Sequence, residues 1–229
     1  ERFVVVNGDV LTDLDVGQLV AFHEARRAEA TIALHKVEDP SAFGVVPTDA
    51  DGRVQAFVEK PPRDEAPTDL INAGTYVLEP SVLDRIEGGR KVSIEREVFP
   101  AMVVDGGLFA MAGDSYWIDT GTPAQYLQAQ LDLVDGVRGA PLPAIHPTAV
   151  VAPSATVDHS VVGPGAVIGD GAVVRDAAVL EDALVGDGSR IEGSIVGERA
   201  FVGDHAVVRG MSVVGFDERV ETGEHLDGV

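Results

Sequence analysis

Two aspartates follow apolar segments that are predicted to be strands, and each has a glycine close by. Asp9 ends the segment FVVVNGD, and Asp119 ends SYWID. Open α/β sheets bind ligands at the carboxyl ends of their strands, where a carboxylate held by a turn can ligate a hard divalent cation. Two such carboxylates could hold a cation that bridges phosphate oxygens, as phosphoryl transfer requires. Each aspartate alone also fits an ordinary turn or cap.

A second pair of candidates, Glu59 and Lys60, stands before two prolines at the end of another predicted strand. A glutamate there can accept hydrogen bonds from sugar hydroxyls, and a lysine can neutralise a phosphate as a point charge. The same two residues could equally form a solvated surface pair. Asn72 to Gly74 are small residues beside which a ligand could approach the backbone, although a simple β-bulge explains them equally well.

Strands and helices alternate as far as about residue 135. The predicted strands lie at 2–6, 30–37, 71–78 and 115–119. The first is a continuous β-branched run, which is typical of a strand buried on both faces. Two more β-runs flank the segment TDADG, a hairpin turn in which Gly52 is placed for a positive φ. The alternation predicts an α/β domain with a mostly parallel sheet.

Two of the expected helices carry start signals. Asp15 and Thr122 are predicted N-caps, and the glutamine three residues after each would complete a capping box. Pro123 stands at the first helical position, where a missing N–H leaves no hydrogen bond unmade. A third, shorter helix is expected over the segment PSVLDRI.

The helices disappear from about residue 144, and a hexapeptide repeat takes their place. An aliphatic residue recurs about every six positions, often followed by glycine or an acidic residue, with a small residue four positions later. This period fits neither a single strand nor a helix, but it fits a triangular coil with inward aliphatic side chains. The pattern predicts a left-handed parallel β-helix over 145–229. Three units are one residue short, those starting at Val157, Leu180 and Ile191.

These two patterns define the expected domains. Residues 1–135 form the α/β part, 136–144 form a linker rich in glycine and proline, and 145–229 form the β-helix. The β-helix is expected to bury apolar faces against a neighbouring subunit, which predicts a homo-oligomer.

Composition limits the partners. The 229 residues include 38 acidic and 17 basic ones, for a formal net charge of −21, which argues against nucleic-acid and anionic-membrane partners. No apolar run approaches the ~18 residues of a membrane span, and the first residues lack the form of a signal peptide. The absence of cysteine excludes disulfides and thiolate metal sites. We expect a cytoplasmic protein.

Taken together, the motifs resemble those of a known family. The segments VNGDVL, DPSAFGVVPTDADGRVQAFVEKP, INAGTYVLEP, SIEREVFP and YWIDTGTPAQYLQA occur in this order and precede the hexapeptide repeat. This order resembles the sugar-phosphate nucleotidyltransferases, and among them the mannose-1-phosphate guanylyltransferases. The resemblance covers nearly the whole chain. It implies a partial Rossmann-like nucleotidyltransferase domain followed by the β-helix.

The resemblance also implies roles for the candidates. Asp9 and Asp119 would bind Mg²⁺ as cofactor, and together with Lys60 they would form the catalytic set. The implied substrate-binding residues are Gly44, Glu59, Lys60, Asn72 and Gly74. The implied reaction is attack by a sugar-1-phosphate oxygen on the α-phosphorus of a nucleoside triphosphate, with release of pyrophosphate. Mannose-1-phosphate and GTP are the implied substrates, and positioning and charge neutralisation would carry the catalysis.

One further signature of the family is missing from the chain. It is a glycine-rich loop of the form GxGTRLxPLT, whose backbone N–H groups cradle the triphosphate. The chain begins one predicted strand before Asp9. We therefore expect a fragment of a longer protein, because the other candidate residues are intact.

Three other functions stay open at this point. A non-catalytic regulatory or assembly subunit would keep the sugar pocket without the phosphate loop. A glucose-1-phosphate thymidylyltransferase or uridylyltransferase would share most of the motifs. A β-helix acyltransferase would need a histidine between coils, and His159, His205 and His225 are candidates that lack an accompanying motif.

Overall fold

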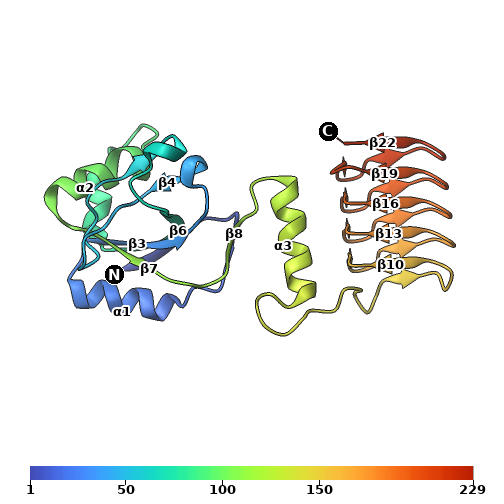
Figure 1. The fold of residues 1–229 in the computed structure, drawn as a ribbon, viewed down its shortest axis with the longest axis horizontal. Helices are drawn as coiled ribbons and strands as arrows, with labels where there is room; N and C mark the ends of the chain where they lie inside the picture. The colour runs from blue at the N-terminus through green and yellow to red at the C-terminus, as the bar shows by residue number, and fades with distance from the viewer. Residues whose placement is uncertain (229) are drawn as a thin grey trace. The chain divides into compact units, whose positions relative to one another are not determined.

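In the computed structural model, which describes residues 1–228, the chain forms two compact units, Glu1–Trp117 and Ile118–Val229. The first unit contains a sheet with the strand order β5-β4-β6-β3-β7, and β1 pairs with β6 beside this path (Figure 1). A separate two-stranded sheet joins β2 (Val10–Thr12) to β8 (Trp117–Asp119). The strands of the larger sheet are β1 (Phe3–Val6), β3 (Ala30–Lys36), β4 (Gly44–Val45), β5 (Val58–Glu59), β6 (Leu70–Leu78) and β7 (Leu108–Ala112).

The sheet is mixed, so the prediction of a mostly parallel sheet is wrong. Strand β3 runs parallel to β7, whereas β6 runs antiparallel to β1, β3 and β4. The side chains of Val4 and Val6 in β1 are 39% and 55% exposed, so the prediction that this strand is buried on both faces is also wrong. Strand β1 is antiparallel to its partner, and an antiparallel strand can leave one face exposed to solvent. The apolar sequence of β1 therefore does not show that both of its faces are buried.

Helices α1 (Val16–Arg26) and α2 (Phe99–Asp105) cover opposite faces of this sheet (Figure 1). Leu19 of α1 packs with Ala33, whereas Phe99 of α2 packs with Ile32, the neighbouring residue of β3. Successive side chains of a strand point to opposite faces, which explains this division. Asp15 caps α1 as predicted, because its Oδ1 accepts a hydrogen bond from the backbone N–H of Gln18 at 3.1 Å.

Four short helical segments complete the first unit. Three are 3₁₀ helices, η1 (Pro40–Ala42), η2 (Arg63–Glu65) and η3 (Pro80–Arg85), and η4 (Ile94–Val98) is a single π-helical turn. The predicted turn at Gly52 is confirmed by its φ of +82° and by the bridge between Thr48 and Val54. Within residues 1–228, no helix is long and apolar enough to cross a membrane.

The second unit is a parallel β-helix preceded by α3 (Pro123–Asp135). Its short strands stack coil upon coil in three sheets (Figure 1). The first sheet contains β10 (Thr156–Asp158), β13 (Val173–Arg175), β16 (Arg190–Glu192), β19 (Val207–Arg209) and β22 (His225–Asp227). The second contains β11 (Val161–Val162), β14 (Ala178–Val179), β17 (Ile195–Val196) and β20 (Val213–Val214). The third contains β9 (Val150–Val151), β12 (Val167–Ile168), β15 (Leu184–Val185), β18 (Phe201–Val202) and β21 (Arg219–Val220).

The hexapeptide repeat fills the interior of the coil, as the sequence predicts. Val162, Val179 and Val196 pair in register in successive coils, and each is at most 1% exposed. The prediction that Leu180 begins a side of the coil is wrong, because Val179 occupies that inward position. Leu180 instead belongs to an apolar cluster with Leu127 of α3.

Helix α3 packs on the second sheet of the β-helix. Leu127 and Leu131 form a buried cluster with Ala178 and Ile195. Because of this packing, the compact units divide after Trp117, upstream of the domain boundary predicted at residue 135. The start of α3 follows the prediction, since the Thr122 side chain accepts a hydrogen bond from Gln125 N and Pro123 occupies the first turn.

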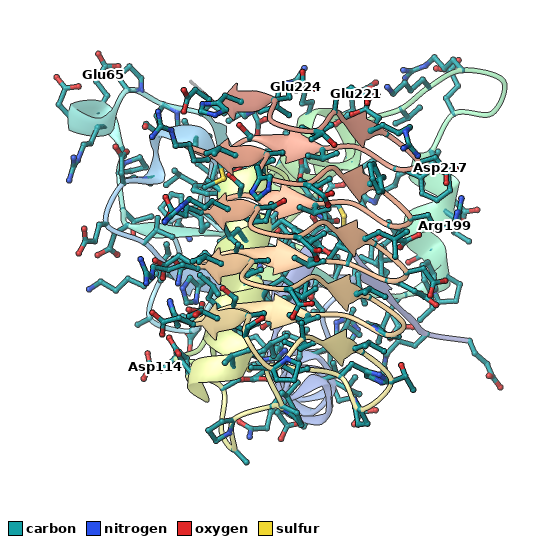
Figure 2. The ribbon with its side chains drawn as sticks, turned by 90° about the vertical axis from the view of Figure 1, so that its right-hand side faces the viewer. Glu65, Asp114, Arg199, Asp217, Glu221 and Glu224 are labelled. Atoms are coloured by element: carbon teal, nitrogen blue, oxygen red, sulfur yellow. The ribbon has the colours of Figure 1, made fainter. Side chains whose placement is uncertain are left out.

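Side chains of opposite charge pair between successive coils. Arg199 donates to Asp217 through Nε and Nη2 at 2.9 and 2.8 Å, and the two residues lie one above the other on the same side of the coil (Figure 2). Nδ1 of His159 lies 2.6 Å from Asp176 Oδ1, and its Nε2 lies 3.1 Å from Asp135 Oδ2 at the end of α3. Hydrogen bonds to these two carboxylates, first Asp176 and then Asp135, raise the pKa of His159.

We predict that His159 stabilises the second unit mainly at low pH. A histidine whose pKa is raised on folding stabilises the folded state below its unfolded pKa, and this effect is lost as the pH rises through the raised pKa. His159→Gln should therefore lower the midpoint of thermal unfolding more at about pH 6 than at about pH 9. His205→Gln is the matched control, because both histidines are exposed and both have a positive φ, 41° and 56°. An equal effect of His159→Gln at both pH values would contradict the prediction.

The chain of β6 bulges at Gly74. The register between β3 and β6 shifts between Ile32 and Leu34, and Gly74 has a φ of +73°. The backbone N–H of Asn7 donates to Gly74 O at 2.8 Å, and a Cβ at Gly74 would lie 2.7 Å from Asn7 Nδ2. Both the backbone conformation and the close approach of Asn7 therefore require glycine at this position.

We predict that Gly74→Ala lowers the free energy of unfolding by about 1–3 kcal/mol, because alanine is strained at this φ and its methyl group would displace Asn7. Urea unfolding of the chain measures the change. Gly8→Ala is the matched control, since a Cβ at Gly8 would have no heavy atom within 4 Å. Equal stability of Gly74→Ala and the wild type would show that the bulge does not constrain the fold.

Candidate functional site

The backbone of Ala73 and Gly74 holds two of the motifs in place. Asn7, two residues before Asp9, donates its N–H to Gly74 O at 2.8 Å. The indole Nε1 of Trp117 donates to Ala73 O at 2.9 Å. The NGD segment and the tryptophan of the WID segment are therefore fixed to adjacent carbonyls of the NAG segment.

The two predicted metal ligands stand at the ends of paired strands. Asp9 is exposed and directly precedes β2, while Asp119 is half-buried and is the last residue of β8, the partner of β2. Asp119 Oδ1 accepts a hydrogen bond from Gly121 N at 2.7 Å, which fixes the carboxylate by its own turn. A turn was one of the two roles predicted for Asp119, and it does not prevent the carboxylate from binding a cation.

The donor chemistry of these aspartates fits Mg²⁺. This ion is commonly held by one or two carboxylates and completes its six positions with water and substrate phosphates. In the described part of the chain, no three or more His, Asp or Glu side chains are grouped as a metal site.

Three of the predicted substrate-binding residues lie at the ladder of β4 and β5. Gly44 pairs directly with Glu59, and a Cβ at Gly44 would lie 3.3 Å from Glu59 Oε2 and 2.8 Å from the Phe57 ring. Glycine at this position therefore leaves room for the carboxylate. Lys60 is exposed, has a φ of +48°, and its N–H bonds Phe43 O at 3.0 Å, so a left-handed turn ends β5.

The other two predicted substrate-binding residues, Asn72 and Gly74, lie in β6. Asn72 Oδ1 accepts a hydrogen bond from Gly74 N at 3.0 Å. Asn72 Nδ2 donates to Glu95 Oε1 at 2.7 Å and to Tyr76 Oη at 2.9 Å. Neither Tyr76 nor Glu95 was predicted as a site residue. The only sequence signal for Glu95 is its place in the SIEREVFP segment, which resembles the family but indicates no chemistry by itself.

A cavity of about 700 Å³ lies elsewhere in the first unit, at the carboxyl ends of the parallel strands β3 and β7. Its charged residues are largely paired, since Lys36 contacts Asp69 at 3.1 Å and Arg63 contacts Asp39 at 3.8 Å. It is lined by His35, Lys36, Val37, Glu38, Arg63, Asp69, Gly113 and Asp114. None of these residues was predicted as a site residue. His35 stacks on Trp117 with ring centroids 5.3 Å apart, so the cavity adjoins the tryptophan that is bound to Ala73.

Comparison with known proteins agrees with the motif order. A family model described as nucleotidyl transferase matches residues 1–136, and a model described as GMPPB C-terminal domain matches residues 141–229. A mannose-1-phosphate guanylyltransferase of Mycobacterium tuberculosis is 51% identical over 144 residues, which are 62% of this chain and 39% of that protein. A mannose-1-phosphate guanyltransferase of Schizosaccharomyces pombe is 48% identical over 127 residues, 55% of this chain and 34% of that protein.

A third relative is the mannose-1-phosphate guanylyltransferase catalytic subunit beta of Drosophila pseudoobscura pseudoobscura. It is 42% identical over 146 residues, which are 64% of this chain and 38% of that protein. The matched residues thus span 34–39% of the length of these curated relatives.

A solved structure shares the fold. It is a Bacillus anthracis protein assigned as a glucose-1-phosphate thymidylyltransferase, in complex with a sucrose. The TM-score is 0.50 at 23% identity, and the match covers 56% of this chain and 53% of that one. At this identity the likeness concerns the fold alone. The first family model covers more than half of the chain and confirms the resemblance inferred from the motifs: the chain belongs to the nucleotidyl transferase family.

Proposed function

We propose that the protein transfers a nucleotidyl group from GTP to mannose-1-phosphate and releases pyrophosphate, and that this chain supplies the sugar-phosphate side of the site. The observation that carries the proposal is the meeting of Asn7 and Trp117 on adjacent carbonyls of Ala73 and Gly74. This arrangement ties the segments that end in Asp9 and Asp119 to the strand that carries Asn72. The relatives named as mannose-1-phosphate guanylyltransferases, at 42–51% identity, favour this sugar and this nucleotide.

Each residue has a distinct part in the proposed chemistry. Asp9 and Asp119 would hold Mg²⁺, which supplies charge neutralisation at phosphate oxygens when bound. Lys60 would pair with the phosphate of the sugar-1-phosphate, and Glu59 would accept hydrogen bonds from its hydroxyls. Glycine is needed at position 44, because a methyl group there would lie 2.8 Å from the Phe57 ring and 3.3 Å from Glu59 Oε2. Holding the acceptor phosphate in a fixed position is itself a large part of catalysis in this kind of reaction.

The alternatives differ in their ligands. A glucose-1-phosphate enzyme would bind that sugar phosphate more tightly than mannose-1-phosphate. The acyltransferase alternative gains no support from His159, because its two ring nitrogens are engaged by Asp135 and Asp176. A regulatory subunit would bind a sugar phosphate or nucleotide without turnover in the complete enzyme.

We also propose that the β-helix mediates self-association, because it exposes apolar side chains. Leu184, Val213 and Phe216 are 44%, 47% and 56% exposed, and a groove of about 310 Å³ lies beside the last two. Apolar patches of this kind often mark interaction surfaces. Sedimentation velocity should show a species heavier than one chain, whereas a single-chain species at all concentrations would contradict the proposal.

Calorimetric titration of this chain with mannose-1-phosphate tests the proposed function. We expect saturable binding in Mg²⁺, a Kd raised at least about 10-fold by EDTA, and loss of this Mg²⁺ dependence in Asp9→Asn and Asp119→Asn. Asp64→Asn, an exposed aspartate of η2, is the control and should keep the dependence. Tighter binding of glucose-1-phosphate would favour the thymidylyltransferase or uridylyltransferase alternative. Binding of neither sugar phosphate would contradict the proposal.

Substitution of two lysines tests where the phosphate group of mannose-1-phosphate binds. Lys60→Ala should raise the Kd for mannose-1-phosphate about 10- to 100-fold, because it removes one charge-assisted contact. Lys36→Ala removes another exposed lysine, which pairs with Asp69 beside the 700 Å³ cavity, and it should leave the Kd unchanged. The opposite ranking of the two variants would place the phosphate in that cavity.

A further inference from the structure

The turn η4 contacts both parts of the proposed sugar site. Glu95 Oε1 lies 2.7 Å from Asn72 Nδ2, and Arg96 Nη2 lies 3.7 Å from Glu59 Oε1. We propose that Glu95 is a positioning residue for the sugar end of the site: it orients the Asn72 amide, and through that amide it holds the bulge at Gly74. The link between the bulge and sugar binding rests on the proposed function. The positioning of Asn72 by Glu95 does not.

The hydrogen bonds around Asn72 form a closed network. Glu95 Oε1 accepts from Asn72 Nδ2 at 2.7 Å and from Tyr76 Oη at 3.3 Å, and Nδ2 also donates to Tyr76 Oη at 2.9 Å. Because Glu95 Oε1 acts as the acceptor, the nitrogen end of the Asn72 amide faces Glu95. The oxygen end is then left to accept from Gly74 N, which it does at 3.0 Å. The acceptor oxygen of Glu95 thus selects the amide orientation that supports the bulge.

The network lies in an apolar setting. Tyr76 is 2% exposed, and burial, more than any other cause, raises the pKa of its hydroxyl, which keeps it protonated as a donor. Phe99, the first residue of α2 and directly after η4, is fully buried and packs edge-on against Tyr76 with ring centroids 5.2 Å apart. Asn72 and Glu95 are themselves half-buried, so the low exposure strengthens mainly the hydrogen bonds of the Tyr76 hydroxyl.

The turn does not depend on Glu95 for its own shape. Ser93 Oγ accepts from Arg96 N at 3.3 Å, and Glu97 Oε1 accepts from Ser93 N at 3.1 Å. Glu97 also pairs with Arg90 at 2.8 Å. These contacts close the turn, so the carboxylate of Glu95 is directed to β6 and not to η4. Arg96 is the matched control from the same segment, because its side chain contacts Glu59 and not η4, and alanine would keep its backbone bond to Ser93.

The ion pair between Arg96 and Glu59 contributes less to positioning the site than the contact between Glu95 and Asn72. The Arg96 side chain is 69% exposed and its distance to Glu59 is 3.7 Å, so solvent screens the pair. Asn72 Nδ2 donates both of its hydrogens inside the protein, to Glu95 and to Tyr76. Asn72 therefore serves a bound sugar by holding the bulge, and not by donating to a hydroxyl.

Hydrogen exchange of the ligand-free protein, measured by NMR, tests the positioning. Glu95→Ala should speed exchange of the Gly74 amide by at least about 10-fold relative to wild type, after correction for any change in global stability. Glu95→Gln keeps an acceptor oxygen and should restore most of the protection, while Glu95→Asp, one methylene shorter, is the milder variant if Glu95→Ala does not fold. Unchanged exchange in the alanine and aspartate variants, or an equal increase in Arg96→Ala, would overturn the proposal.

Binding then tests what the bulge serves. Glu95→Ala should raise the Kd for mannose-1-phosphate about 10-fold and leave the Kd for inorganic phosphate unchanged, because Lys60 would hold the phosphate alone. An equal loss for both ligands would indicate a merely structural role and would overturn the link to the sugar. If the wild type binds no sugar phosphate, the proposed function fails, and the exchange of Gly74 still decides whether Glu95 holds the bulge.

Discussion

The geometry of the site depends on a single backbone constraint, the left-handed conformation of Gly74 in the middle of β6. At a φ of +73°, with Asn7 against the position of its missing side chain, only glycine fits without displacing a neighbour. The two carbonyls at this bulge accept hydrogen bonds from Asn7 and from the Trp117 indole. A strand interior without the bulge would satisfy these carbonyls through sheet pairing, and neither segment would be held there.

The β-helix depends on a different constraint, the stacking of equivalent strands and side chains in successive coils. Its strands pair in register between coils, and hydrogen bonds between coils link residues 17 positions apart, as from Asp170 N to Asp187 Oδ1. Inward aliphatic residues fill the interior, while the corners carry ion pairs such as Arg199 with Asp217. Helix α3 covers part of the second sheet, and His159 links the end of α3 to the coil.

Features of the fold that depend on neighbouring residues could be predicted from the sequence. Features that depend on pairing between distant residues could not. Neighbouring residues determine the helix caps at Asp15 and Thr122 and the six-residue repeat, and the structure confirms these predictions. The direction of β6 and the exposure of Val4 depend on partners far along the chain, which an apolar run cannot identify. The role of Glu95 could likewise not be predicted from the sequence, because its contact with Asn72 joins residues 23 positions apart. Motif order predicted the candidate site residues, whereas only the fold shows which of them contact one another.

A crystal structure of this chain with mannose-1-phosphate and Mg²⁺ tests the central claim most directly, because it shows where the sugar phosphate lies. We predict density for the sugar beside Glu59, Asn72 and the bulge at Gly74, with the phosphate at Lys60. Density for the sugar phosphate in the cavity lined by His35 and Arg63 would contradict this claim, and so would a crystal that binds the ligand at neither place.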